Sequence, residues 1–141
     1  MNKYLELKTR HEKEVNDFPI MFAFSKEQFN EGMKKLGLNE NDTNKILSIG
    51  YGGYIRKSDK EAFFSLHERQ EKELKDAIQS DTTGEEFIYD MFNYELANHE
   101  YCITLDVSDT LDALNLTIEE VDENPLLLKG LKKAIKNQKE Y

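Results

Sequence analysis

A segment near the middle of the chain combines residue types that can bind a phosphate group. Three of the seven glycines lie in LSIGYGGYIRKSD, residues 47–59, and the same segment carries the basic side chains of Arg56 and Lys57. The backbone N–H groups of a glycine-rich loop can surround a phosphate, and cationic side chains can neutralise its charge. The chemistry that this segment suggests is therefore the binding of a nucleotide or another anion.

The spacing of these glycines matches neither of the common phosphate-binding loops. A dinucleotide-binding loop needs G-x-G-x-x-G between a strand and a helix, and a P-loop ends in G-K-[ST]. Here the glycines occupy positions 50, 52 and 53, and a strand-like Tyr-Ile-Arg follows them. We therefore interpret the segment as the turn of a short β-hairpin. The alternative is a small anionic ligand site or an enzyme site centred on the glycine hairpin, residues 48–58. Its contact residues would be Tyr51, Tyr54, Arg56 and Lys57, with a contribution from His99.

Histidine and cysteine could supply metal ligands or a nucleophile, but their spacing supports neither. Each of the three histidines precedes a glutamate, and none continues to the H-E-x-x-H pattern of zinc proteases. His67 and Glu71 are four residues apart on an expected helix, which gives two ligands and no complete site. Cys102 has acidic neighbours, which oppose thiolate formation, while a pairing with His99 stays open. We predict no catalytic residue, no metal and no cofactor.

The most unusual chemical feature is a long stretch without basic residues. No Lys or Arg occurs between Lys75 and Lys129, and these 53 residues contain 14 acidic side chains. The other 88 residues contain 19 basic and 14 acidic side chains, which total +5. Helix surfaces usually mix both signs because i,i+4 pairs stabilise them. A surface with acids alone produces an electrostatic field that attracts basic partners.

Within this stretch, Asp106, Asp109 and Asp112 are three residues apart, so we expect them on roughly one face of a helix. They do not form a calcium loop, because the EF-hand glycine and the final bidentate glutamate are missing. Two interpretations stay open, a solvated face with capping residues or an acidic docking surface over residues 76–123. The second is our hypothesis, and it assigns partner contacts to eight carboxylates: Glu85, Glu86, Asp90, Asp106, Asp109, Asp112, Glu119 and Glu120.

Length and composition suit one ordinary domain over residues 1–141. The 8 Phe and 7 Tyr argue against disorder. A single cysteine fits a reducing compartment, the N-terminus lacks the apolar region of a signal peptide, and no apolar run is long enough to span a membrane. We therefore expect a cytoplasmic protein with no membrane contact. The net charge of −9 also disfavours direct binding to nucleic acid.

Helical periodicity dominates the chain and predicts the elements that position these residues. Apolar residues three and four apart predict helices over 3–17, 26–36, 59–80 and 84–98, and a last helix that begins at Pro125. Apolar residues on both sides of the glycine turn predict a hairpin over 46–55, and EYCIT, residues 100–104, could add a short strand. The predicted fold class is α+β and mainly α-helical, a single domain with a small glycine-turn β-hairpin packed on helices.

Capping residues refine these boundaries. A capping box is a Ser or Thr followed three residues later by Glu or Gln. Four such pairs are expected to begin helices: Ser25–Gln28, Ser58–Glu61, Thr83–Glu86 and Thr117–Glu120. We also expect Ser108 to cap a short helix over DTLDALN. Gly37 and Asn115 are expected to end helices in the left-handed conformation.

Four stretches together resemble a family of small acidic proteins of about this length whose domain has no known function: FAFSKEQFNEGMKKLGL, SIGYGGYIRKSD, GEEFIYDMFNYELANHEY and DTLDALNLTIEEV. The resemblance covers nearly the whole chain and implies an origin in Firmicutes, especially gut bacteria, or in their phages and mobile elements. It carries no known chemistry, so it implies no catalytic residue. The family's hairpin is richer in glycine, and the family's glycine after DTLDAL is Asn115 here; both differences tolerate the left-handed region.

The resemblance also implies a context for the acidic stretch. Small acidic proteins of mobile elements often bind and block host proteins, including nucleases with basic grooves, and spaced carboxylates can imitate phosphates. We therefore expect a non-enzymatic binding protein that docks its acidic face onto a basic protein surface, such as that of a nucleic-acid-binding or defence protein. A homodimer formed through exposed aromatic residues and PLLLKGL, residues 125–131, stays open.

Overall fold

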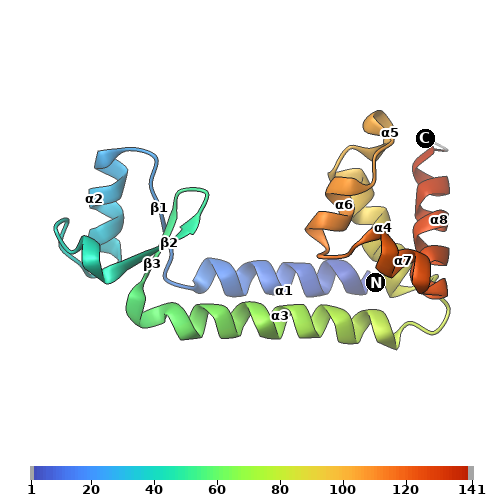
Figure 1. Cartoon of the computed structure of the whole chain (residues 1–141), viewed down its shortest axis with the longest axis horizontal. Helices are drawn as coiled ribbons and strands as arrows, with labels where there is room; N and C mark the ends of the chain where they lie inside the picture. Colours follow the sequence, from blue (N-terminus) through green and yellow to red (C-terminus); the bar gives the residue numbers. More distant parts are fainter. Residues whose placement is uncertain (1, 140–141) are drawn as a thin grey trace. The chain divides into compact units, whose positions relative to one another are not determined.

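The computed structural model describes residues 2–139 (Figure 1). The chain divides into two compact units: unit 1 comprises Met1–Thr9 and Glu73–Tyr141, and unit 2 comprises Arg10–Lys72. Two helices, α1 (Lys3–Asp17) and α3 (Lys60–Ser80), contribute residues to both units. Both helices are predicted from the sequence and confirmed, whereas a single domain over residues 1–141 stays a prediction.

Unit 2 contains a three-stranded antiparallel sheet with the strand order β1-β3-β2. The predicted hairpin is confirmed as β2 and β3, and the run FPIMFAF, for which no strand is predicted, supplies β1 at one edge. A strand of two residues is too short to show the alternation of apolar and polar residues that marks a strand in sequence. The elements of this unit besides the two shared helices are β1 (Met21–Phe22), α2 (Lys26–Lys35), η1 (Thr43–Lys45), β2 (Ile46–Gly50), β3 (Gly53–Arg56) and η2 (Lys57–Asp59).

Helix α2 begins and ends where its capping residues predict. The N–H of Gln28 donates to Oγ of Ser25 at 3.1 Å, and Oε1 of Gln28 accepts from the N–H of Phe24 at 2.8 Å. These two hydrogen bonds satisfy N–H groups at the start of the chain's second helix. After the helix, Gly37 has φ +76°, so the predicted left-handed stop is confirmed.

A small apolar core joins α2 to the sheet. Met33 of α2 and Leu36, which caps the C-terminus of that helix, are buried against Met21 of β1. The rings of Phe29 and Tyr54 meet edge to face with centroids 5.7 Å apart. The hairpin is therefore packed on a helix, as predicted.

Unit 1 is helical, and its core lies mainly between α4 and α8, which run beside each other (Figure 1). Met91 and Phe92 of α4 are fully buried there. A Cβ atom on Gly130 of α8 would lie 2.4 Å from Cγ2 of Ile88, so the two helices approach each other as closely as glycine allows. The elements of this unit besides the two shared helices are α4 (Phe87–Asn98), α5 (Tyr101–Thr104), α6 (Ser108–Ala113), α7 (Ile118–Glu123) and α8 (Pro125–Lys139).

The C-terminal helix begins at Pro125, as predicted, but PLLLKGL is not an exposed interface. Leu127 and Leu131 are buried in the core of unit 1, and Gly130 packs on α4. The apolar face that looks available in sequence is therefore used within unit 1, because α8 covers α4 with it.

Two further helix boundaries match the sequence. The N–H of Glu120 donates to Oγ1 of Thr117 at 3.1 Å, which confirms Thr117 as the predicted N-cap. Asn115 has φ 55° and ends α6 in the left-handed region, as predicted. Asparagine is one of the few residues with a side chain that adopts this conformation readily.

The capping box Thr83–Glu86 does not form. Helix α4 begins at Phe87 rather than at residue 84, and Glu86 occupies the N-cap position without a side-chain capping bond. Oγ1 of Thr83 accepts instead from the N–H of Glu85 at 3.1 Å. The prediction is wrong because a buried carboxylate, that of Asp81, takes the N–H groups that a capping box would satisfy.

Three other local predictions also differ from the structure. Ser58 lies inside η2, which leads directly into α3, and Ser108 is the first residue of α6 rather than its cap. The segment 100–104 is helical, not a strand. Its β-favouring residues are overridden because Tyr101 is buried in the helical core of unit 1.

Candidate functional site

The two units differ in net charge. Counted over the sequence, unit 1 contains 17 acidic and 8 basic side chains, a net charge of −9, whereas unit 2 contains 11 of each. The sequence shows an acidic stretch, and the structure adds that the other unit is neutral. The net negative charge of the chain therefore lies in unit 1.

In unit 2, acidic and basic side chains lie close together in ion pairs. At least four pairs join acids and bases within it: Lys13–Asp17 at 2.7 Å, Lys45–Asp42 at 3.8 Å, Arg56–Asp59 at 2.8 Å, and Arg69–Glu14. These pairs leave its surface with local compensation between the signs.

The acids of the stretch 76–123 do not all reach the surface. Asp81 and Glu95 are buried, Asp90 is half-buried, and the other eleven are exposed. The two buried carboxylates hold the fold of unit 1 together, so they are not available to a partner. Neither belongs to the eight predicted contact residues, which are exposed apart from Asp90.

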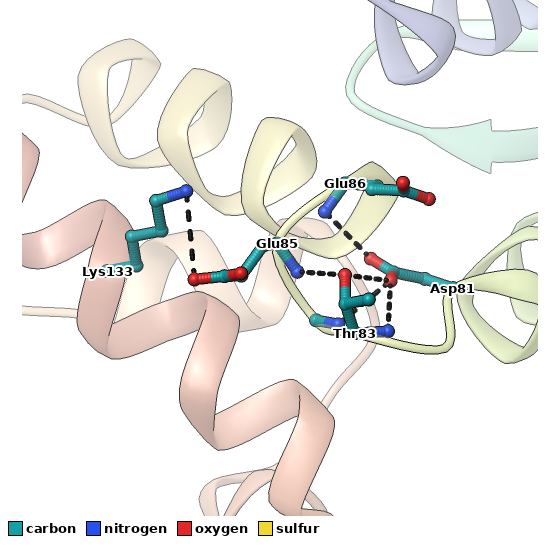
Figure 2. A network of polar contacts seen from close by, with 6 residues as sticks. Asp81, Thr83, Glu85, Glu86 and Lys133 are labelled. Carbon is teal, nitrogen blue, oxygen red and sulfur yellow. Dashed lines mark hydrogen bonds and ion pairs between the residues drawn. The ribbon is translucent and has the colours of Figure 1, made fainter.

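Asp81 organises the loop between α3 and α4 (Figure 2). Its Oδ1 accepts from the N–H groups of Thr83 at 2.9 Å and Gly84 at 2.8 Å, and its Oδ2 accepts from those of Glu86 at 3.2 Å and Ile88 at 3.0 Å. Burial raises the pKa of this carboxyl, but the four N–H donors outweigh burial and hold the pKa below its ordinary value. The ionised form of Asp81 is thus part of the folded state.

A lysine from α8 compensates part of the acidic stretch. Nζ of Lys133 lies 4.0 Å from Oε1 of Glu85 (Figure 2) and 4.6 Å from the centroid of the Tyr89 ring. Burial raises the pKa of Asp90, a neighbour on α4, while the charge of Lys133 lowers it. The predicted contacts Glu85 and Asp90 therefore lie near Lys133, which is too distant in the sequence for residue spacing to indicate this.

The acids of α5 to α7 have no such compensation. Among the residues that the structure describes, none of the following exposed acids forms an ion pair: Glu100, Asp109, Asp112, Glu119, Asp122 and Glu123. Together with Asp106, we call these residues the α5–α7 acidic segment. Four of the predicted contacts (Asp106, Asp109, Asp112 and Glu119) belong to it, and Glu120 follows Glu119 on α7.

Two members of the α5–α7 acidic segment have specific local roles. Asp106 precedes α6 and accepts from the N–H of Ser108 at 2.8 Å, which lowers the pKa of its carboxyl. Asp112 lines a surface pocket of about 310 Å³ with Glu120, Lys75 and three neighbours. Because Asp106 lies outside the helix, the spacing of three does not by itself place it with Asp109 and Asp112.

An apolar tip interrupts the acids. Ile103 and Leu105 are 75% and 63% exposed, and they lie between Glu100 and Asp106 in sequence. Glu100 and Leu105 both have φ 57°, in the left-handed region that side chains avoid. Strained residues of this kind persist only where the surrounding structure holds them.

A buried polar cluster around Glu95 was not visible in the sequence. The hydroxyl of Tyr4 donates to Oε1 of Glu95 at 3.0 Å, and Nζ of Lys8 lies 3.3 Å from the same atom. Nε2 of His99 lies 3.5 Å from Oε2 but makes no aligned hydrogen bond with a described residue. Oγ1 of Thr110 donates to the Glu95 backbone carbonyl at 3.3 Å. Only the i,i+4 spacing of Glu95 and His99 could have indicated part of this cluster.

The glycine-rich turn has a structural explanation. Gly50 and Gly52 have φ +89° and +78°, and a Cβ on Gly52 would lie 2.6 Å from the Phe24 ring. Tyr51 itself has φ 53° at the tip of the turn. Glycine is therefore needed here both for the left-handed backbone and for space beside an aromatic ring.

The hairpin side chains offer little free positive charge for a ligand. Nε of Arg56 donates to Asp59 at 2.8 Å, and its Nη1 donates to the carbonyl of Leu36 at 3.4 Å. Tyr54 packs on α2, while Tyr51 and Lys57 are exposed. His99 belongs to unit 1, where it contacts Glu95. The alternative ligand set stays a prediction.

Metal and nucleophile candidates stay apart where the structure can be described. Within residues 2–139, no three His, Cys, Asp or Glu side chains are grouped so that they could hold a metal ion. Cys102 is an exposed free thiol on α5. Every helix in the described part of the chain lacks the length or the apolar character needed to cross a bilayer.

The fold and these features define an α+β, mainly helical protein with a neutral unit and an acidic one. Residues 3–137 match the model of a family of unknown function, DUF7659. The chain therefore belongs to this family, whose match covers both units. The comparisons gave no match to a curated protein and none to a solved structure.

Proposed function

We propose that this protein is a non-enzymatic, cytoplasmic binding protein, an accessory of a phage or mobile element, whose acidic face docks onto a basic protein surface. The partner class is a nucleic-acid-binding host protein such as a defence nuclease. Carboxylates on such a face occupy the place of phosphates in a basic groove. The single cysteine supports a cytoplasmic location and the resemblance supports a mobile-element origin, and both are part of the proposal.

One observation carries this proposal. Six exposed acids of the α5–α7 acidic segment have no ion pair within the described residues, whereas acids and bases of unit 2 form at least four ion pairs. Acids without ion pairs repel one another and so destabilise the folded protein. Binding to a basic partner would offset this repulsion, which gives a physical reason for the acids to be present. Complementary potentials of this kind steer association and select partners.

The apolar tip supplies what a charged surface lacks. Stable interfaces have an apolar centre surrounded by a polar rim. Ile103 and Leu105 are exposed on the same segment as Glu100 and Asp106. We therefore assign the centre of the contact to the α5 tip and its rim to the neighbouring acids.

The test reverses charge at Asp106, Asp109 and Asp112 by substitution with Lys. Affinity capture from nuclease-treated host lysate should yield a basic protein with the wild type and not with this variant. Against the purified partner, affinity should fall roughly tenfold or more, and wild-type binding should weaken steeply between 50 and 500 mM salt. Retention of wild-type affinity by the reversed variant would sink the proposal.

A matched control separates position from net charge. Glu27, Glu40 and Glu68 are exposed acids of unit 2, and their substitution with Lys changes the net charge by the same amount. The proposal expects this control to keep the partner. An equal loss in both variants would show that net charge alone drives capture and that the α5–α7 acidic segment is not the docking surface.

Substitution of Leu105 with Gly should separate folding from binding. Glycine accepts φ 57° without strain, so the free energy of unfolding should rise, or fall by less than about 1 kcal/mol after the entropy of glycine is included. Binding should nevertheless weaken, because the exposed side chain at the centre of the contact is gone. Urea denaturation and partner titration measure the two effects; a variant that binds as tightly as the wild type contradicts the assigned centre.

A further inference from the structure

The edge of the sheet in unit 2 carries exposed aromatic residues that the acidic docking surface does not use. Phe22, Phe24 and Tyr51 are all exposed, the last two at 77% and 96%. Phe22 and Phe24 lie against the glycines of the turn: a Cβ on Gly52 would meet the Phe24 ring at 2.6 Å, and a Cβ on Gly53 would meet the Phe22 ring at 3.1 Å. The turn therefore supports an aromatic surface that faces solvent.

Strand β1 lies at the edge of the sheet, where one side of its backbone pairs with β3. Ala23 donates to the carbonyl of Gly52 at 2.9 Å, so the hydrogen-bonded pairs between β1 and β3 are formed by Ala23 and, two residues earlier, by Met21. The N–H and C=O of Phe22 therefore point away from β3. Open edges of this kind pair readily with another strand.

A pocket lies beside this edge. Its volume is about 450 Å³, and its lining combines Met21, Phe22, Phe24 and Gly32 with three polar side chains of α2: Gln28, Glu31 and Lys35. Glu31 and Lys35 are exposed, one helical turn apart, and neither forms an ion pair with another described residue. The patch thus combines the exposed Phe24 ring and the partly apolar pocket with the outward N–H and C=O of Phe22. It also carries one negative charge, on Glu31, and one positive charge, on Lys35.

We infer that this patch is the interface of a symmetric homodimer in which β1 of two copies pair antiparallel. A two-fold axis places each surface against itself, so a self-complementary patch is what such an interface requires. Phe22 of each copy can then exchange its N–H and C=O with the other, and the Phe24 ring of each can approach the pocket of the other. Glu31 of each copy meets Lys35 of the other.

A different protein strand would need only the edge and the apolar part of the pocket. The paired opposite charges on α2 favour a second copy, because the two-fold arrangement satisfies both of them at once. Unit 2 contains 11 acids and 11 bases, so its net charge is zero. Its net charge therefore does not oppose the approach of a second copy. The dimer is independent of the proposed acidic docking surface, which lies in unit 1.

The experiment measures the mass of the full chain by sedimentation velocity between micromolar and millimolar concentration. The wild type should form a dimer, and Phe24→Ser should shift it to monomer while its circular dichroism spectrum stays unchanged. A wild type that stays monomeric throughout overturns the inference and leaves the edge to a strand of another protein.

Charge exchange then identifies the interface independently of folding. Glu31→Lys alone and Lys35→Glu alone should each raise the dimer dissociation constant about tenfold, because each places like charges together twice. A mixture of the two single variants should form heterodimers, since each contact is then attractive. A dimer that is insensitive to both substitutions, or a mixture without preference for heterodimers, places the interface elsewhere and overturns the inference.

Discussion

Substitution of Asp81 with Asn should lower the free energy of unfolding at pH 7 by about 2–3 kcal/mol. The carboxylate accepts from four backbone N–H groups in the loop before α4 and is 2% exposed. The amide of asparagine has one acceptor oxygen, and its NH₂ group would point at backbone N–H groups, which are also donors. At least two of these N–H groups would then be left without a good acceptor inside the fold. Urea denaturation followed by far-ultraviolet circular dichroism measures the change.

The pH dependence of this difference gives a second readout. The pKa of Asp81 is lower in the folded state than in the unfolded state. Its charge therefore stabilises the fold fully above the unfolded pKa of about 4, and the stabilisation disappears as pH falls through the lower folded pKa. The gap between the wild type and Asp81→Asn should narrow over that acid range. A gap that is constant with pH would contradict the role of the ionised form.

Asp90 provides a matched control for the same substitution. It is half-buried on α4, and burial raises the pKa of its carboxyl. A raised carboxyl pKa means that the ionised form is less favourable in the folded state than in the unfolded state. Asp90→Asn should therefore cause no loss of stability at pH 7. Equal destabilisation by both substitutions would show that the hydrogen-bond pattern of Asp81 is not the cause.

Substitution of Glu95 with Ala should lower the free energy of unfolding by about 3 kcal/mol. The side chain is 2% exposed, and its carboxylate accepts from the hydroxyl of Tyr4 and lies 3.3 Å from Nζ of Lys8. The substitution leaves the Tyr4 hydroxyl and the Lys8 ammonium without the Glu95 carboxylate, and it leaves a cavity beside α1. Chemical denaturation measures the loss, and the position of the denaturant midpoint reports it directly.

An exposed acid of the same stretch is the control for Glu95. Glu119 lies on α7 and has no ion pair with a described residue, so Glu119→Ala should change stability by less than about 0.5 kcal/mol. Each of the two substitutions removes one negative charge, so they change the net charge equally. If both substitutions cost the same, the buried cluster does not contribute to the fold as its geometry indicates.

Local physics explains which elements could be predicted. The long helices follow from apolar residues at spacings of three and four, and the hairpin follows from a glycine turn between apolar flanks. Gly37, Asn115 and Pro125 mark helix ends because their own backbone preferences decide the conformation. Such signals lie within a few residues of where they act, so one sequence contains all of the information they need.

The capping box at Thr83 and the strand at 100–104 show where local signals fail. Each has the correct residue types, but a distant or buried group offers a better arrangement. The carboxylate of Asp81 takes the N–H groups before α4, and burial of Tyr101 selects a helical turn. Competition of this kind depends on three-dimensional packing, which residue spacing does not contain.

By itself, the sequence determined the charge of the acidic stretch, the fold class and most of the helices, because composition and periodicity are properties of the chain alone. Only the tertiary structure decided which acids are available. It buries Asp81 and Glu95, brings Lys133 to Glu85, and leaves six exposed acids of the α5–α7 acidic segment without an ion pair to any described residue. The physical reason is that burial and Coulomb interactions depend on distance in space, and residues 48 positions apart in the chain become neighbours when α8 packs on α4.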